Sequence, residues 1–216
     1  MIEALGVRID LPVEHFGKAI REIGIGFFFA RAAHAAARHA APARKEIGVR
    51  TVFNLLGPLT NPAGARAQIV GVPSPELIDL IAETLAELVV ERALVVHGAG
   101  GLDEISLAGE TLAAEVKDGG VRRLTITPED FGVSRAPIEA VRGGSALENA
   151  AAIRDIFAGE RGPRRDIVIA NAAAALVAAG VAPGFGDGAQ LARAALASGA
   201  AKEKLAALVD FTQQAK

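Results

Sequence analysis

The sequence predicts an α/β fold in which a central, mainly parallel or mixed sheet is flanked by helices. Two observations carry this prediction. Between residues 66 and 97, an amphipathic helix pattern lies between two apolar strand patterns, which is the order of a right-handed parallel crossover. In the last third of the chain helical periodicity dominates, and much of it is alanine, which favours helices that can cover a sheet closely.

The first 62 residues predict helices around one short strand. Asp10-Leu11-Pro12 begins a helix that runs to about Ile23 and ends at Gly24. The apolar run 25–30 predicts a buried strand, and 32–41 predicts an alanine-rich helix. The stretch 43–62 predicts two short helices, because glycine in Gly57-Pro58 can adopt a left-handed cap and proline cannot continue the helix.

The crossover unit is the clearest part of the pattern. A strand at 66–72 is followed by Ser74-Pro75, a strong helix start. The apolar run 92–97 predicts a strand that is buried on both faces. The helix between them carries one apolar stripe, made of Leu77, Ile78, Ile81, Leu85 and Leu88.

Turn and cap signals organise the rest of the chain. Strands are predicted at 111–117 and 121–126, joined by Asp118-Gly119-Gly120, and a capped helical turn at 127–130. Ser145 and Glu148 form a capping box for a helix that ends at Gly159. Three further helices are predicted at 165–179, 189–198 and 200–214.

Composition narrows the function classes. The formal net charge is −2, which argues against a general binder of nucleic acid or membrane surfaces. The chain has no cysteine, so disulfides and thiolate sites are excluded. The longest apolar run, 167–180, is broken by Asn171 and is too short to span a bilayer. With no secretory signal pattern at the N-terminus, a soluble cytoplasmic protein is expected.

Two stretches hold residues suited to chemistry. Arg44 opens a run that also holds Arg50 and Asn54, and an arginine fork is a natural partner for a carboxylate or phosphate. Asp103-Glu104 follows a strand and a glycine turn, at the end of an α/β sheet where ligands bind. Such oxygen ligands suit Mg²⁺, although a solvated acidic turn explains the pair alone more simply.

The two stretches resemble one enzyme family. Residues 44–62 read R-x-x-x-G-x-R-T-x-F-N-x-x-G-P-L-T-N-P and residues 96–104 read V-x-G-x-x-G-L-D-E, as in anthranilate phosphoribosyltransferases. The resemblance implies a class III phosphoribosyltransferase or nucleoside-phosphorylase-like fold. Residues 1–30 would then start the α/β lobe, 31–62 would belong to a small helical lobe, and 63–216 would form the α/β catalytic lobe.

The resemblance also implies an activity and a site. The reaction is phosphoribosyl transfer from phosphoribosyl pyrophosphate (PRPP) to anthranilate in tryptophan biosynthesis. Asp103 and Glu104 would bind the Mg²⁺ that accompanies PRPP, and Arg44 would contact the anthranilate carboxylate. Asn54, Gly57 and Pro58 would complete the substrate-binding set. No residue is assigned as catalytic, and His34 is given no role.

Two family motifs, Gly-Thr-Gly-Gly-Asp and Lys-His-Gly-Asn-Arg, do not occur here, so the chain is expected to be the C-terminal portion of the enzyme. Four apolar residues would then be exposed or would pack against another chain: Val52, Phe53, Leu55 and Leu56. This predicts a homo-oligomer, such as a homodimer. The alternative is a catalytically incomplete fragment that only binds ligands or assembles. A nucleic-acid-binding relative is disfavoured by charge, and nucleoside phosphorylases lack the 44–62 string.

Overall fold

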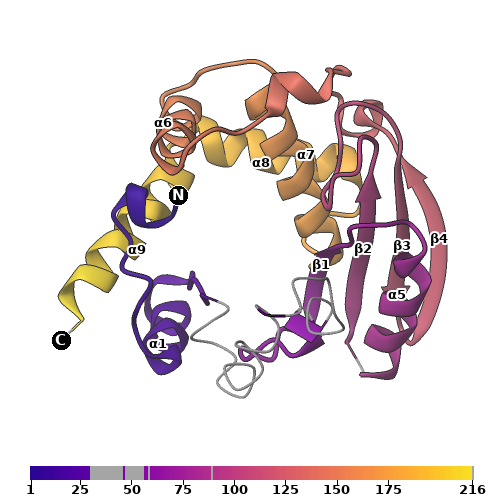
Figure 1. The fold of residues 1–216 in the computed structure, drawn as a ribbon, viewed down its shortest axis with the longest axis horizontal. Coiled ribbons are helices and arrows are strands. Elements are labelled where there is room, and N and C mark those ends of the chain that lie inside the picture. Colours follow the sequence, from indigo (N-terminus) through magenta and orange to yellow (C-terminus); the bar gives the residue numbers. More distant parts are fainter. Residues whose placement is uncertain (30–45, 47–55, 58, 89, 216) are drawn as a thin grey trace. The chain divides into compact units, whose positions relative to one another are not determined.

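The chain divides into two units. One comprises Met1–Gly64, Gly144–Ala151 and Gly199–Lys216, and the other comprises Ala65–Gly143 and Ala152–Ser198. The division into parts 1–30, 31–62 and 63–216 stays a prediction. The structure, a computed structural model, describes residues 1–29, 46, 56, 57, 59–88 and 90–215 (Figure 1).

The second unit is built on a four-stranded sheet with the strand order β1-β2-β3-β4. The first two strands are parallel, and each later neighbour pairs antiparallel. The sheet is therefore mixed, and the predicted α/β class is confirmed. The strands are β1 (Ala67–Gly71), β2 (Arg92–Gly98), β3 (Thr111–Lys117) and β4 (Gly120–Ile126).

Helix α5 (Leu77–Glu87) connects β1 to β2 and packs against β2, β3 and β4. Its buried stripe includes Ile78, Ile81 and Leu85, as the sequence predicts. An exposed ion pair adds to this packing, because Arg123 of β4 donates to both carboxylate oxygens of Asp79 at 2.5 and 2.6 Å. Hydrogen bonding from Arg123 lowers the pKa of Asp79 below its ordinary value.

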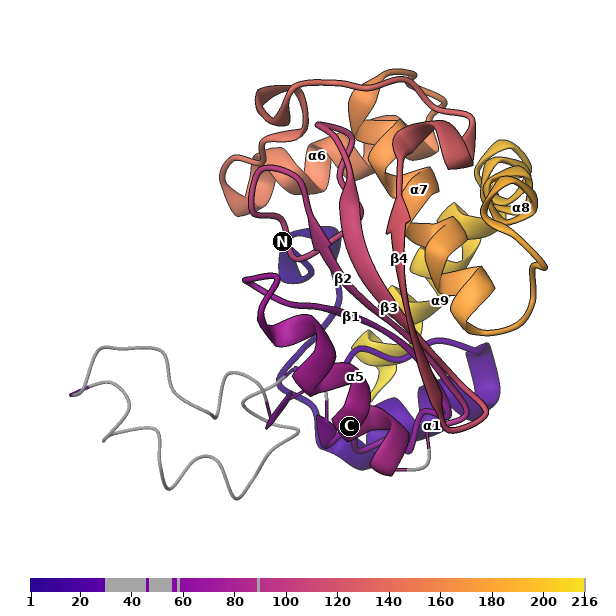
Figure 2. The same ribbon diagram turned by 90° about the vertical axis from the view of Figure 1, so that its right-hand side faces the viewer.

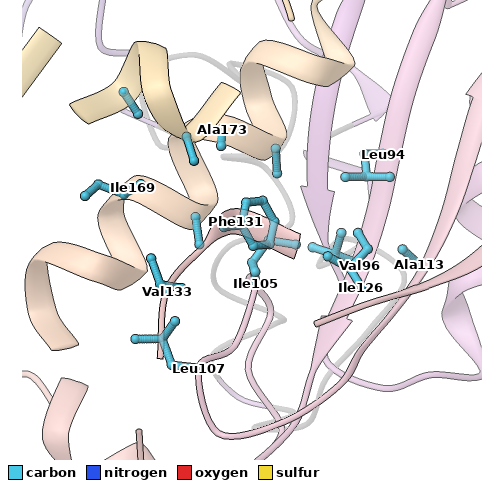
Figure 3. Close-up of a cluster of buried hydrophobic side chains, with 14 of the residues drawn as sticks. Leu94, Val96, Ile105, Leu107, Ala113, Ile126, Phe131, Val133, Ile169 and Ala173 are labelled. Atoms are coloured by element: carbon cyan, nitrogen blue, oxygen red, sulfur yellow. The ribbon is translucent and has the colours of Figure 1, made fainter. Parts of the chain in front are cut away.

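Helix α7 (Pro163–Ala178) contacts β1 and β2, and Figures 1 and 2 show the sheet lying between α5 and α7. Side chains alternate along a strand, so Leu94 and Val96 of β2 share one face. They pack in the main hydrophobic core with Ile169 and Ala173 of α7, as Figure 3 shows. Burial on both faces explains why β2 reads as a continuous apolar run.

Helix α8 (Phe185–Ala197) packs closely on α7, because Gly188 brings the two backbones together. A β-carbon at Gly188 would stand 2.8 Å from the Ala173 carbonyl oxygen. The sequence prediction started this helix at residue 189 and was wrong by four residues. Low glycine propensity argued for a loop, but helix packing overrides it. Two short 3₁₀ helices, η3 (Pro128–Phe131) and η4 (Ile138–Val141), follow β4 along the chain.

The first unit contains η1 (Glu3–Leu5), α1 (Val13–Ile23) and α9 (Ala200–Gln214). Helices α1 and α9 pack together, and Lys204 donates to the Ile23 carbonyl at 2.6 Å. The backbone N–H of Arg8 donates to the buried Thr212 hydroxyl at 3.1 Å. Helix α6 (Ala146–Phe157) starts in this unit and continues into the second.

Local signals predicted several boundaries correctly. Gly24 ends α1 in the left-handed conformation at φ 75°, and its N–H donates to the Ile20 carbonyl. Both predicted caps form: Asp130 accepts from the Thr127 N–H at 2.7 Å, and Glu148 accepts from the Ser145 N–H at 2.7 Å. None of the helices in the described ranges is long and apolar enough to cross a membrane.

The predicted buried strand at 25–30 is wrong for the residues that the structure describes. Residues 25–29 have no regular secondary structure and are half-buried. They pack back on α1 instead: a β-carbon at Gly26 would stand 2.8 Å from the Phe16 carbonyl oxygen, and the rings of Phe16 and Phe28 lie 6.0 Å apart. The apolar side chains therefore serve packing on a helix rather than a strand ladder.

Three finer predictions also need correction. Ser74 does not cap α5, which begins at Leu77, because its hydroxyl bonds to the Glu76 carboxylate. Leu88 lies beyond the last turn of α5 and is 53% exposed. Gly57 has helical backbone conformation and is not left-handed, and Thr60 closes the turn by donating to the Leu56 carbonyl at 2.8 Å.

Candidate functional site

The acidic pair lies in a tight loop that follows β2. Gly98 and Leu102 exchange two backbone hydrogen bonds, of 2.7 and 3.2 Å, and so close the loop. Gly100 and Gly101 make the turn between them with φ angles of 83° and 79°. Side chains rarely adopt this conformation, which explains the glycines of the motif. The loop then delivers Asp103 to the carboxyl ends of the parallel strands β1 and β2.

Two further glycines let the acidic pair lie directly on the strand ends. A β-carbon at Gly71, the last residue of β1, would overlap the Asp103 carbonyl group. A β-carbon at Gly98 would overlap the Glu104 carbonyl oxygen and stand 2.8 Å from the Ser106 β-carbon. Both strands therefore end in a residue without a side chain because the acidic loop occupies that space.

Asn171 of α7 holds the loop from the other side. Its Oδ1 accepts a hydrogen bond from the Ile105 N–H at 2.9 Å, and its Nδ2 donates to the Ile105 carbonyl at 3.1 Å. The same Nδ2 donates to the Ile167 carbonyl at 3.0 Å, within α7. Ile105 is fully buried, and its side chain points into the core between the sheet and α7 (Figure 3).

A buried polar network continues the loop beyond Ile105. The Ser106 N–H donates to the Thr111 hydroxyl at 3.0 Å, and the Ser106 hydroxyl donates to the Ala99 carbonyl at 2.8 Å. Ser106 and Thr111 are 1% and 0% exposed, so each bond is made away from water. These bonds tie the loop to the start of β3 and keep it in one conformation.

The acidic pair faces a cavity of about 310 Å³. Both carboxylate residues are exposed, and neither is in an ion pair with another described residue. Partial burial, together with the neighbouring Asp103 charge, raises the pKa of Glu104 above its ordinary value. The cavity is lined by Ile69, Gly71, Val96, Asp103, Glu104 and Asn171.

The donor set fits Mg²⁺. Carboxylate oxygens are the hard ligands that this ion takes, and an added cation would relieve the repulsion between Asp103 and Glu104. Within the described ranges no three His, Cys, Asp or Glu side chains gather into a possible metal site. An ion held by this pair would therefore complete its shell with water and phosphate oxygens, as Mg²⁺ commonly does.

Among the other predicted site residues, Gly57 alone is part of the chain that the structure describes. Gly57 is half-buried and has a helical backbone. Arg44, Asn54 and Pro58 lie outside the described residues, as does His34. Their predicted roles in substrate binding therefore stay predictions.

Sequence reasoning missed Gly71 and Asn171 as parts of the site. Gly71 could not be recognised, because a glycine at a strand end is common and its neighbour Asp103 is remote in sequence. Asn171 left a signal, since it is the single amide in the apolar run 167–180. His97, which precedes Gly98 in β2, has a structural contact: its Nδ1 lies 2.9 Å from the Val72 carbonyl oxygen.

Comparison with known proteins shows which family model and which relatives the chain is similar to. The family model "Glycosyl transferase family, a/b domain" matches residues 1–202. The anthranilate phosphoribosyltransferase of Thermomicrobium roseum is 54% identical over 208 residues, covering 95% of this chain and 60% of the relative. That of Rubrobacter xylanophilus is 53% identical over 214 residues, covering 99% of this chain and 62% of the relative.

Solved structures of anthranilate phosphoribosyltransferases are also similar to this chain. The crystal structure of anthranilate phosphoribosyltransferase from Thermus thermophilus has a TM-score of 0.91 and 51% identity, over 98% of this chain and 63% of that one. The Saccharomyces cerevisiae enzyme in complex with PRPP and Mg has a TM-score of 0.90 and 25% identity, over 99% of this chain and 62% of that one. The chain thus spans about three fifths of the length of these relatives.

Proposed function

Because the chain belongs to the glycosyl transferase family defined by this α/β domain, we propose that it transfers a phosphoribosyl group from PRPP to anthranilate. The products are N-(5-phosphoribosyl)anthranilate and pyrophosphate, in a step of tryptophan biosynthesis. Two relatives that are 54% and 52% identical over the 208 and 207 aligned residues are named anthranilate phosphoribosyltransferase. The proposal concerns the whole enzyme, of which this chain matches about three fifths.

One observation carries the proposal: Asp103 and Glu104 lie at the carboxyl ends of β1 and β2, facing a cavity with no cationic lining residue. Ligands bind at this edge of open α/β sheets. We assign the two carboxylates to Mg²⁺. When bound, the ion would neutralise charge on the pyrophosphate leaving group. The loop's hydrogen bonds would keep the carboxylates in place before PRPP arrives.

The part of the proposal that concerns anthranilate, the acceptor substrate, rests on residues 44–62. Arg44 would hold the anthranilate carboxylate through a charge-assisted contact, with Asn54, Gly57 and Pro58 around the substrate. Held in this way, the amino nitrogen would form a bond to ribose C1 while the bond from C1 to the pyrophosphate oxygen breaks. Pyrophosphate leaves with the electron pair, and the nitrogen loses a proton. No residue of the chain is assigned as the base.

Anthranilate fluorescence provides the test, since the chain contains no tryptophan or tyrosine and adds little background. If the part of the enzyme present in this chain suffices for the reaction, the purified chain will consume anthranilate with PRPP and Mg²⁺ and will stop when a chelator is added. The variant Asp103→Asn/Glu104→Gln should lose this turnover. The variant Glu83→Gln/Glu87→Gln, which neutralises two exposed carboxylates of α5, is the matched control and should retain it.

Failure would be informative at two levels. Equal rates in wild type and in Asp103→Asn/Glu104→Gln would overturn the metal assignment. A folded wild-type chain without any turnover would contradict the activity for this chain. A chain that still binds anthranilate or PRPP without turnover would then act as a binding module.

We also infer that the protein works as a homo-oligomer in the cytoplasm. Leu56, one of the apolar residues of the segment 44–62, is 37% exposed, and a second copy of the chain could cover it. The proposed substrates are small, charged and soluble. Sedimentation at increasing concentration should reveal association. A strictly monomeric profile at high concentration would refute this part of the proposal.

A further inference from the structure

We propose that Asn171 is a positioning residue for the metal: its side-chain amide fixes the backbone that carries Asp103 and Glu104, without itself holding the ion. This inference rests on the proposed Mg²⁺ site. It adds to that site a residue from α7, far away in the sequence, on which the affinity of the acidic pair depends.

The contact pattern is specific to the loop. The amide of Asn171 bonds both polar backbone groups of Ile105, the residue that follows Glu104. An amide that pairs with the N–H and the C=O of the same residue holds both peptide groups that flank its α-carbon. The third bond, to the Ile167 carbonyl one helical turn earlier, fixes the amide on α7. The loop is thus anchored to the helix through one side chain.

The acidic pair lies between two such anchors. Leu102, on one side, is bonded to Gly98 of β2, and Ile105, on the other, is bonded to Asn171. Only Asp103 and Glu104 lie between them, so their backbone has little freedom. Two adjacent carboxylates repel each other, and this repulsion would spread the loop if its backbone were not held. Loss of one anchor should therefore let the carboxylates separate and weaken their joint hold on a cation.

Asn171 acts indirectly. Both of its amide groups are engaged: Oδ1 accepts from Ile105, and Nδ2 is a donor that cannot bind a cation. Groups that orient metal ligands typically contribute 10-fold to 100-fold in metal affinity, roughly the range expected for this amide. Asn149 offers a natural comparison, because its amide makes the same paired contact with Gly144, at 2.8 and 3.2 Å, away from the acidic pair in the sequence.

The experiment uses the full 216-residue chain, Mn²⁺ as the probe and NMR relaxation of assigned backbone amides as the readout. Mn²⁺ at the site should enhance relaxation of the Gly71, Gly98 and Ile105 amides, and a titration gives the dissociation constant. The test variant is Asn171→Ser, whose hydroxyl can still bond the Ile167 carbonyl but cannot reach Ile105. The matched control is Asn149→Ser.

We expect Asn171→Ser to raise the Mn²⁺ dissociation constant roughly tenfold or more, and to speed hydrogen exchange of the Ile105 amide. Asn149→Ser should lower the melting temperature without changing the Mn²⁺ constant. A constant for Asn171→Ser within about twofold of wild type would overturn the inference and leave the metal site standing. Should Asn171→Ser fail to fold, Asn171→Ala decides by the same criterion, because it removes both bonds to Ile105 and adds no charge to the cavity.

The absence of site-specific enhancement in the wild-type chain would be a different result. It would remove the metal site of the proposed function, and the positioning role of Asn171 with it. The two failures are distinguishable because the first needs wild-type binding and the second is seen in its absence.

Discussion

Gly71 ends β1 with no side chain because the main chain of Asp103 occupies the position that a β-carbon would take. An added β-carbon would stand only 2.5 Å from the Asp103 carbonyl carbon and 2.9 Å from its β-carbon. The atoms that must give way include backbone, so no side-chain rotation relieves the overlap. The strand end and the acidic loop are therefore one packed unit.

The first prediction concerns this contact. Gly71→Ala should reduce the free energy of unfolding by about 1–3 kcal/mol, the usual cost of overpacking, and should weaken Mn²⁺ binding by moving Asp103. Urea unfolding and the Mn²⁺ titration measure the two effects. The control is Gly120→Ala at the start of β4, where the new carbon would meet the Lys117 carbonyl oxygen at an ordinary 3.5 Å. Equal stability of the two variants would contradict the argument.

The second prediction tests the buried network. Thr111→Val keeps the shape of the side chain but removes the oxygen that accepts the Ser106 N–H. A buried donor without an acceptor costs about 1–3 kcal/mol, and we expect a loss of that size in the free energy of unfolding. Thr125→Val on β4 changes an exposed threonine and should stay within about 0.5 kcal/mol of wild type. Thermal or urea unfolding of both variants is the measurement.

Arg193 gives the third prediction. Its Nη2 donates to the carbonyls of Phe131 and Gly132, each at 2.9 Å, and so joins α8 to the end of η3. Arg193→Met should lower the free energy of unfolding by about 1–3 kcal/mol, because hydrogen bonds from a charged group are lost. Arg122→Met breaks only an exposed pair with Glu115 and should cost at most about 1 kcal/mol. A larger loss for Arg122→Met in urea unfolding would refute this ranking.

The fourth prediction is a pH dependence. Hydrogen bonds from Arg135 lower the pKa of Glu129 from 4.5 to about 2. A carboxylate whose pKa is lower in the folded state stabilises the fold above pH 4.5 and loses this effect as the pH falls toward 2. The stability difference between wild type and Glu129→Gln should therefore shrink over that range. Carboxyl NMR should show the Glu129 pKa returning toward 4.5 in Arg135→Gln. A difference independent of pH would contradict this.

Local patterns predicted most of the elements because their causes are local. Thr127 and Asp130 are three residues apart and cap their own turn, and Gly24 ends its helix by its own φ angle. The strand–helix–strand unit followed from periodicity, which reports burial directly. The sequence predictions were wrong where packing against another element determined the local structure. Residues 25–29 pack on α1, and Gly188 lies inside a helix because Ala173 faces it.

The same distinction between local and tertiary causes holds for the candidate site. The sequence alone determined that Asp103 and Glu104 are adjacent after a strand and a glycine turn, and its motifs pointed to the family to which the chain belongs. Only the tertiary structure decided what supports them, since Gly71 and Asn171 reach the loop from elements 32 and 66 positions away from their partners. The physical reason is that burial and hydrogen bonding join residues by distance in space, which a linear pattern does not record.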